Sequence, residues 1–200
     1  KGAIVKRVLN VGGNSKNIAL PAQYAGFEHL MLDIDPNCSP DILCDARELG
    51  SLAAAQFDAV YCSHNLEHFY RHDVRKVLSG FHHVLLPNGF VHIRVPDIVE
   101  VMRQAIQRNL DLEDILYISP SGPIMVLDVI YGYSVEIERS GNDFFAHKTG
   151  FTDRSLSKAL HLAGFPKQYC VSANLEIEIV AFKAEPDMET RSLFGIVDHA

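Results

Sequence analysis

The chain has 200 residues, of which 48% are hydrophobic and 22% charged, which fits one soluble globular domain that buries its own core. Its net charge of −7 argues against a nucleic-acid partner, because binding nucleic acid requires a basic face. No apolar run approaches the ~20 residues of a membrane span. The first residues, "KGAIVKRVLN", lack the features of a signal peptide. We therefore expect a cytoplasmic protein with no membrane partner.

Strand and helix signals alternate over the first hundred residues. Apolar runs predict strands that end at Gly12 and near Asp33, followed by strands at 41–43, 57–63 and 90–95. Helices are predicted at 46–55, which is rich in alanine, and at 72–85, where apolar residues recur with helical spacing. Strands that alternate with helices over short connections indicate a parallel sheet covered on both faces.

The second half of the chain begins with a segment that departs from this alternation. Residues 109–146 contain "SPSGPI", "YGY" and "SGND", too many turn formers for one helix, so we predict an insertion or lid within a single domain of residues 1–200. A helix follows, capped by Thr152 or Asp153 and stopped by Gly164. The runs "KQYCVS" and "NLEIEIVAFKA" predict an antiparallel hairpin at the sheet edge. The tail from Glu185 is expected to be loosely held.

The stretch "RVLNVGGNSK" predicts a strand that runs into a glycine turn. Gly12 and Gly13 let backbone N–H groups approach a ligand, with a helix N-terminus expected behind them. Asp33 follows by about 20 residues, where an acidic side chain accepts the ribose hydroxyls of a nucleoside. A plain tight turn with a capping aspartate is the simpler alternative. A dinucleotide loop would need G-x-G-x-x-G, which "GGNSKN" does not supply.

Taken together, the motifs resemble those of a class I S-adenosylmethionine-dependent methyltransferase of the small type-11-like group. The resemblance rests on "VLNVGGNSK", "LMLDIDP", "ILCDAREL", "FDAVYCSHNLEHF", "VLLPNGFVHIRVPD" and "HKTGFTDRSLSKALHLAGF". It implies an α/β fold: a Rossmann-like, seven-stranded, mostly parallel sheet with helices on both faces and a C-terminal antiparallel hairpin. It also implies S-adenosyl-L-methionine as the cofactor, bound by Gly12, Gly13, Asn14, Lys16, Asp33, Asp45, Ala46, Cys62 and Ser63.

The glycine loop departs from the family pattern at three positions. Asn10 stands where the family has an acidic residue, and Asn14 and Lys16 stand where it has glycines. Asn14 is the mildest change, because asparagine tolerates a positive φ. Lys16 is compatible with the loop if it points outward or meets the carboxylate of the cofactor. These departures also favour an alternative, a non-catalytic methyltransferase-fold domain that serves as a binding or interaction module.

Methyl transfer is an in-line displacement, so the protein mainly positions the acceptor and removes its proton. The candidate bases are His64, Glu67, His68 and His147. For Glu67 and His68, capping of the next helix is the alternative role. His64, His68 and His72 have helical spacing, but no third ligand group is apparent, so no metal is expected. We expect a small-molecule or sugar-type acceptor, with Tyr131, Tyr133 and His147 as candidate lining. The sequence makes no prediction of oligomeric state.

Overall fold

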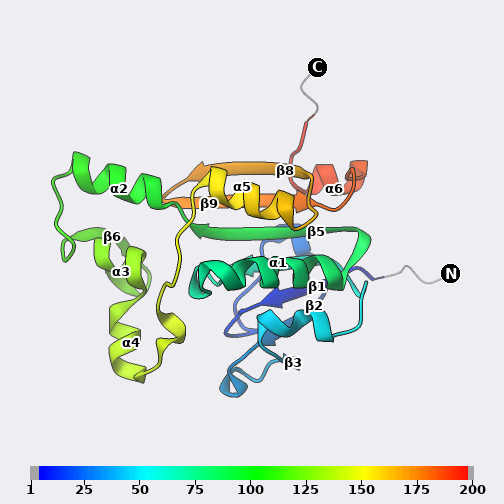
Figure 1. Cartoon of the computed structure of the whole chain (residues 1–200), viewed down its shortest axis with the longest axis horizontal. Helices are drawn as coiled ribbons and strands as arrows, with labels where there is room; N and C mark the ends of the chain where they lie inside the picture. The colour runs from blue at the N-terminus through cyan, green and yellow to red at the C-terminus, as the bar shows by residue number, and fades with distance from the viewer. Residues whose placement is uncertain (1–4, 198–200) are drawn as a thin grey trace.

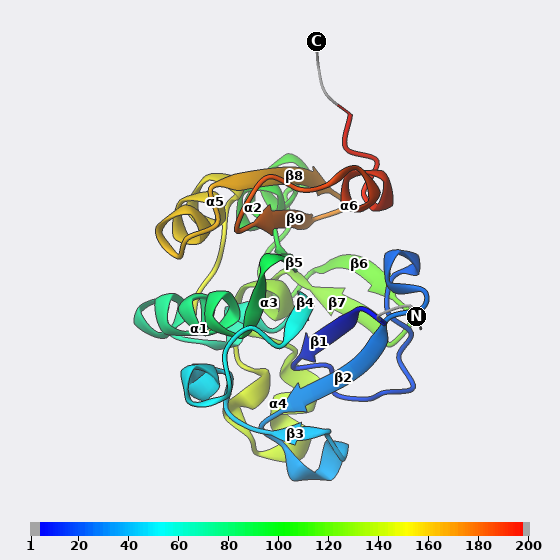
Figure 2. The same cartoon turned by 90° about the vertical axis from the view of Figure 1, so that its right-hand side faces the viewer.

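The computed structural model describes residues 5–197 and contains the predicted seven-stranded sheet, in the order β3-β2-β1-β4-β5-β9-β8 (Figures 1 and 2). The first five strands run parallel, and β9 and β8 form the antiparallel hairpin at one edge. The strands are β1 Arg7–Val11, β2 Glu28–Asp33, β3 Ile42–Leu43, β4 Phe57–Ser63, β5 Leu85–Pro96, β8 Lys167–Ala173 and β9 Glu176–Phe182. The predicted fold class is confirmed.

The two faces of the sheet are covered by different elements (Figure 2). Helices α1 (Arg71–Val84) and α5 (Asp153–Leu162) cover one face and share the main core with inward residues of β1, β4, β5 and β9. Thr152 caps α5, and Gly164 follows it with a φ of +95°, as the sequence predicts. The opposite face has a smaller core that includes Tyr24, Phe90 and Phe182.

Two helices that the sequence predicts do not form. No helix follows the glycine turn in the described chain, and the only helical element between β1 and β2 is a 3-10 helix at Ala22–Tyr24. The intervening residues are rich in turn formers and include Pro21, which ends any helix that would reach it. The alanine-rich segment after β3 forms only a 3-10 helix, Ala46–Ser51, which stops just after Gly50.

The prediction of a loose tail from Glu185 is wrong. Residues Met188–Leu193 form α6, which is capped by Asp187 and buries Thr190. Phe194 and Ile196 then pack against the smaller core. The tail therefore covers the sheet face that α1 and α5 leave open (Figure 2).

Residues 109–147 lie beyond the carboxyl ends of the parallel strands (Figure 1). They follow α2 (Ile98–Gln107) and contain the hairpin β6 (Ile115–Ser119) and β7 (Gly122–Met125), then α3 (Val126–Tyr131), α4 (Ser134–Ser140) and a 3-10 helix, Asp143–Phe145. A separate small core joins this insertion to α2 through Val101, Leu116, Val126 and Val129. Within residues 5–197, no helix has both the length and the apolar character needed to cross a membrane.

Candidate functional site

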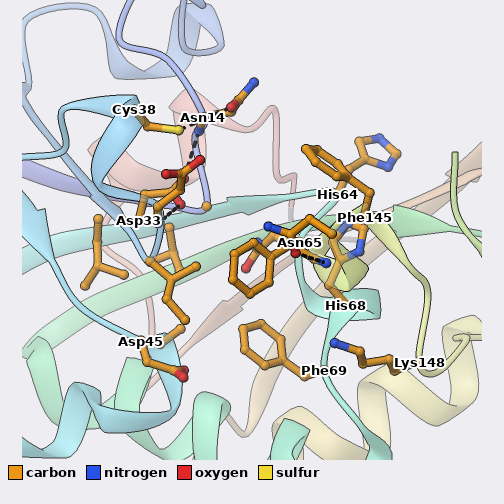
Figure 3. A pocket seen from close by; sticks show the side chains of 18 of the residues that line it. Asn14, Asp33, Cys38, Asp45, His64, Asn65, His68, Phe69, Phe145 and Lys148 are labelled. Atoms are coloured by element: carbon orange, nitrogen blue, oxygen red, sulfur yellow. Dashed lines mark hydrogen bonds between the residues drawn. The ribbon is translucent and has the colours of Figure 1, made fainter. Parts of the chain in front are cut away.

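A cavity of about 980 Å³ opens at the carboxyl ends of the parallel strands, between the sheet and the insertion (Figure 3). β2 and β3 lie on one side of β1, and β4 and β5 lie on the other, so the order of the strands reverses at β1. In open α/β sheets this switch point is where ligands bind. Figure 3 shows Asp33 and Asp45 along one side of the cavity, with His64, Asn65 and His68 along the other.

The glycine turn forms the floor of the cavity through Gly12 and Asn14. Gly12 has a φ of +70°, and a Cβ atom there would lie 2.1 Å from the side-chain nitrogen of Asn65. Only glycine allows both this backbone conformation and this close approach. Asn14 has a φ of +57°, the conformation that its substitution for glycine requires. The turn thus keeps the backbone conformation of a glycine loop at Gly12 and at Asn14, where a glycine is replaced.

Asp33 is held in place at the end of β2 by two backbone amides. Its Oδ2 accepts from Asn14 N at 3.2 Å and its Oδ1 accepts from Asp35 N at 3.0 Å. Each carboxylate oxygen keeps a second lone pair for a ligand. Because the side chain also lines the cavity, Asp33 is oriented to receive hydroxyl groups there.

Asp45 and Ala46 line the cavity as expected, but the Asp45 carboxylate already has a partner. Arg47 Nη2 donates to Asp45 Oδ2 at 2.6 Å, and Arg47 N donates to Oδ1 at 2.8 Å. The Arg47 guanidinium lowers the pKa of Asp45. The pair therefore offers both a donor and an acceptor at this end of the cavity.

Several residues expected at the cofactor do not line the cavity. Lys16 is bound to Asp41, whose Oδ1 accepts from Lys16 Nζ at 2.5 Å. Gly13 packs over Asn10, whose buried amide donates to His29 Nε2 at 3.3 Å. The lining residues do not include Gly13, Lys16, Cys62 or Ser63.

His64 turns the chain out of β4 with a φ of +48°, and its ring lies between two carboxylates. Nε2 donates to Glu176 Oε2 at 2.5 Å, and Nδ1 lies 3.5 Å from Glu67 Oε1. Burial opposes protonation, but the two carboxylates outweigh it and raise the pKa of His64 to about 9. His64 is therefore an imidazolium at neutral pH. Glu176 also accepts from Arg94 Nε at 2.8 Å.

The structure brings together Glu67, His68 and His147, which are predicted separately as candidate bases. Glu67 and His68 lie in a 3-10 helix, Leu66–His68, directly after the β4 loop. His147 comes from the end of the insertion. One potential ligand atom from each of the three lies within 4.8 Å of the others. The sequence did not predict this group, because His68 and His147 lie far apart in the chain.

Two contacts place His147 in this group. Gly132, with a φ of +107°, leaves room for the returning chain, because a Cβ atom there would lie 2.2 Å from Phe145 O. Just after His147, Lys148 N donates to Glu67 O at 2.8 Å. Burial lowers the pKa of His147, so its imidazole is neutral at pH 7.

The insertion supplies the remaining wall of the cavity with polar and aromatic side chains. The wall consists of Tyr133, Glu136, Arg139, Ser140, Asn142, Phe144, Phe145 and Lys148. Tyr133 thus lies where it is expected. Tyr131 is 61% exposed and is not part of the cavity lining.

Comparisons with known proteins agree with the fold. The model of the methyltransferase domain family matches residues 9–93, which span β1 through most of β5. The crystal structure of a SAM-dependent methyltransferase from Archaeoglobus fulgidus covers 90% of this chain and 86% of its own, at 16% identity and a TM-score of 0.57. No curated protein matches the chain.

A second solved structure with this fold contains a cofactor product. The Burkholderia thailandensis 1,6-didemethyltoxoflavin-N1-methyltransferase, with bound 1,6-didemethyltoxoflavin and S-adenosylhomocysteine, covers 90% of this chain and 72% of its own, at 17% identity and a TM-score of 0.50. The chain has the class I methyltransferase fold. S-adenosylmethionine is the cofactor that the family match and this fold support.

Proposed function

We propose that this chain transfers a methyl group from S-adenosylmethionine to a small-molecule or sugar-type acceptor bound in the cavity. The observation that carries the proposal is the Asp33 carboxylate, which two backbone amides orient toward the same cavity that His64 and His68 line. One continuous space therefore has a ribose-binding end and an acceptor end.

The chemistry of the cavity fits a sulfonium cofactor better than a phosphate-bearing one. Asp33, Asp35, Asp45 and Asp73 all contribute to the lining, and the arginine beside them, Arg47, pairs with only two, Asp45 and Asp73. No helix N-terminus follows the glycine turn in the described chain, so the dipole that favours phosphate groups is missing there. An acidic wall attracts a cationic sulfonium and repels a pyrophosphate. When bound, S-adenosylmethionine would supply the electrophilic methyl group.

The insertion side fits a polar acceptor. Glu136, Arg139, Asn142 and Lys148 offer hydrogen-bond donors and acceptors, and Phe145 offers a ring face. Such a mixture suits a hydroxylated ring, because aromatic stacking and directed hydrogen bonds act on different parts of the same molecule. We propose that residues 109–146 close over this acceptor.

Among the four candidate bases, the geometry favours His68. Both nitrogens of His64 already face carboxylates, so His64 has no free lone pair for an acceptor proton. His68 lines the cavity, and its Nδ1 donates to Ala146 O at 3.1 Å, which leaves Nε2 available. Glu67 and His147 lie close to His68, but neither is part of the cavity lining, where His147 was expected. We assign them a supporting role in positioning His68 and the acceptor.

Titration calorimetry with S-adenosylmethionine and S-adenosylhomocysteine tests the cofactor site. Asp33→Ala should weaken binding by about 2–3 kcal/mol, or roughly 30- to 150-fold, because buried hydroxyl groups lose their acceptor. Asp35→Ala is the matched control and should weaken binding less. Binding abolished by Asp35→Ala and unaffected by Asp33→Ala would overturn this assignment. No binding of either ligand at millimolar concentration by the wild type would overturn the proposed function itself.

A non-catalytic binding module is the second candidate, and one observation favours it. The Asn10 amide, which stands at the family's acidic position, is buried beneath the loop and bonds His29, so it does not reach the cavity. This candidate predicts cofactor binding without turnover. Transfer of a labelled methyl group from S-adenosylmethionine to any member of a panel of sugars and phenols would exclude it. Tight cofactor binding with no methyl transfer to any of these compounds would favour it.

A further inference from the structure

Glu67 is a buried carboxylate that lacks a hydrogen-bond partner. The residue is 1% exposed, and neither of its carboxylate oxygens accepts a hydrogen bond from any described residue. The nearest cationic group is His64 Nδ1, 3.5 Å from Oε1. A buried charge is strongly unfavourable unless it is paired or coordinates a metal ion. His64 offers Glu67 an ion pair without a hydrogen bond and shares its charge with Glu176, so both carboxylate oxygens of Glu67 keep lone pairs that no described residue uses.

Two histidines face this carboxylate, and each is fixed in the same tautomer. His68 Nδ1 donates to Ala146 O at 3.1 Å, and His147 Nδ1 donates to Val129 O at 2.8 Å. A carbonyl oxygen only accepts, so each Nδ1 carries a proton and each neutral ring keeps its lone pair on Nε2. A backbone carbonyl on the other ring nitrogen is the usual outer-shell partner of a metal-binding histidine.

The spacing of the three side chains leaves room for an ion. Their potential ligand atoms lie within 4.8 Å of one another. Neither imidazole forms an ion pair or a hydrogen bond with Glu67 in the described chain, so neither ring already occupies its carboxylate. Ligand atoms that share one metal at about 2.0–2.2 Å lie roughly 3–4 Å apart, so rotamer shifts of about 1 Å would complete the coordination.

We propose that Glu67, His68 and His147 bind one divalent transition-metal ion in the wall of the cavity. Two imidazoles and one carboxylate suit Zn²⁺ or Fe²⁺ and leave coordination positions open. His68 belongs to the cavity lining, so an ion bound to it would lie next to the space where an acceptor would bind. The metal site does not depend on methyl transfer. If both proposals hold, the ion would bind an acceptor oxygen, and His68 would be its ligand in place of a free base.

Metal titration of tag-free protein tests the site directly. Cys38 and Cys44 also line the cavity and could bind zinc, so the titrations use a Cys38→Ser/Cys44→Ser background. We expect about one equivalent of Zn²⁺ by calorimetry, and Co²⁺ should give visible absorption bands of a nitrogen- and oxygen-bound ion. Millimolar or weaker binding of both ions by this protein would overturn the proposal.

Asparagine variants remove the ligand and keep the hydrogen bond. In His68→Asn and His147→Asn, the amide NH₂ occupies the place of Nδ1–H, while the Nε2 lone pair is lost. Each variant should weaken Zn²⁺ binding by at least 10-fold and abolish the Co²⁺ bands. His72→Asn is the matched control, since its side chain is 79% exposed, and it should bind like the parent. Equal Zn²⁺ affinities in all three variants would overturn the assignment of the ligands.

Glu67→Gln tests the proposal through the melting temperature of the protein, measured with and without Zn²⁺. The change keeps the shape of the side chain and removes the buried charge, so the metal-free variant should melt at or above the temperature of the parent. Zn²⁺ should raise the Tm of the parent, because an ion that binds only the folded state stabilises it. The variant should lose this rise. A zinc-induced rise that survives Glu67→Gln would overturn the proposal.

Discussion

The sheet and the insertion at 109–147 form opposite walls of the same cavity, but they are stabilised differently. The main core of the sheet joins five strands to α1 and α5 through many fully buried side chains. The insertion shares a small separate core with α2, and its last residues are joined to the sheet side by hydrogen bonds such as His68 Nδ1 to Ala146 O. Regions with few buried contacts open at lower free energy than a central sheet. The sheet wall of the cavity is therefore expected to be rigid and the insertion wall adjustable.

The largest expected effect tests the sheet side of this comparison. Phe81 is fully buried between α1 and the sheet, and Phe81→Ala should lower the free energy of unfolding by about 3–5 kcal/mol. Chemical denaturation measures the loss. Phe144→Ala, at a partly exposed position of the insertion, should change the same quantity by less than about 0.5 kcal/mol. Comparable losses for the two variants would contradict the difference between the regions.

Gly132→Ala should open the insertion without unfolding the sheet. Gly132 has φ and ψ of 107° and 160°, a conformation essentially restricted to glycine, and its new Cβ would meet Phe145 O. We expect a cost of about 2–3 kcal/mol, seen as faster hydrogen exchange over residues 126–147. Gly141→Ala is the control, because Gly141 also has a positive φ, +64°, but a Cβ there meets no atom within 4 Å, so it should cost less. Faster exchange throughout the sheet would show that the two regions unfold together.

Asp128→Asn tests how the stability of the insertion depends on pH. Asp128 is 4% exposed and accepts from Met125 N, Ser134 N and Ser134 Oγ. Burial opposes ionisation, but these hydrogen bonds outweigh it and lower the pKa of Asp128. The carboxylate therefore stabilises the fold above its unfolded pKa of about 3.9, and this contribution is lost as the pH falls through the folded pKa.

The variant should lose about 1–2 kcal/mol at pH 7. Its stability should fall less steeply than that of the wild type below about pH 5, so the two curves should converge in acid. Urea denaturation from pH 7 to pH 2 measures both curves. Glu113→Gln, an exposed change in the same segment, should leave the pH profile unchanged. Parallel curves for Asp128→Asn and the wild type would contradict the assigned role.

The smallest effect is expected at the glycine loop on the sheet side of the cavity. Lys16 and Asp41 form a partly exposed pair, so Lys16→Ala should cost less than about 1 kcal/mol of stability, and added salt should reduce the difference. Lys76→Ala removes a comparable exposed pair with Glu48 and is the control. Calorimetry adds a second outcome, since a more than tenfold loss of S-adenosylmethionine affinity in Lys16→Ala would indicate a contact with the cofactor instead of Asp41.

The sequence by itself determined the sheet and the ends of its strands. Alternating apolar runs and turn residues predicted the strands that end at Asp33 and Ser63, and both ends reach the edge of the sheet where the cavity opens. Capping chemistry predicted α5 between Thr152 and Gly164. These features were predictable because hydrophobic period and turn preference act within a few residues.

Only the tertiary structure decided which polar side chains meet. Lys16 pairs with Asp41, and the Asn10 amide donates to His29. His147, at the end of the insertion, lies close to Glu67. The sequence also did not predict the failure of a helix to follow Gly12 or the packing of α6 on the sheet. Contacts between polar residues distant in the chain leave no local period, and their geometry is fixed only when the surrounding core packs.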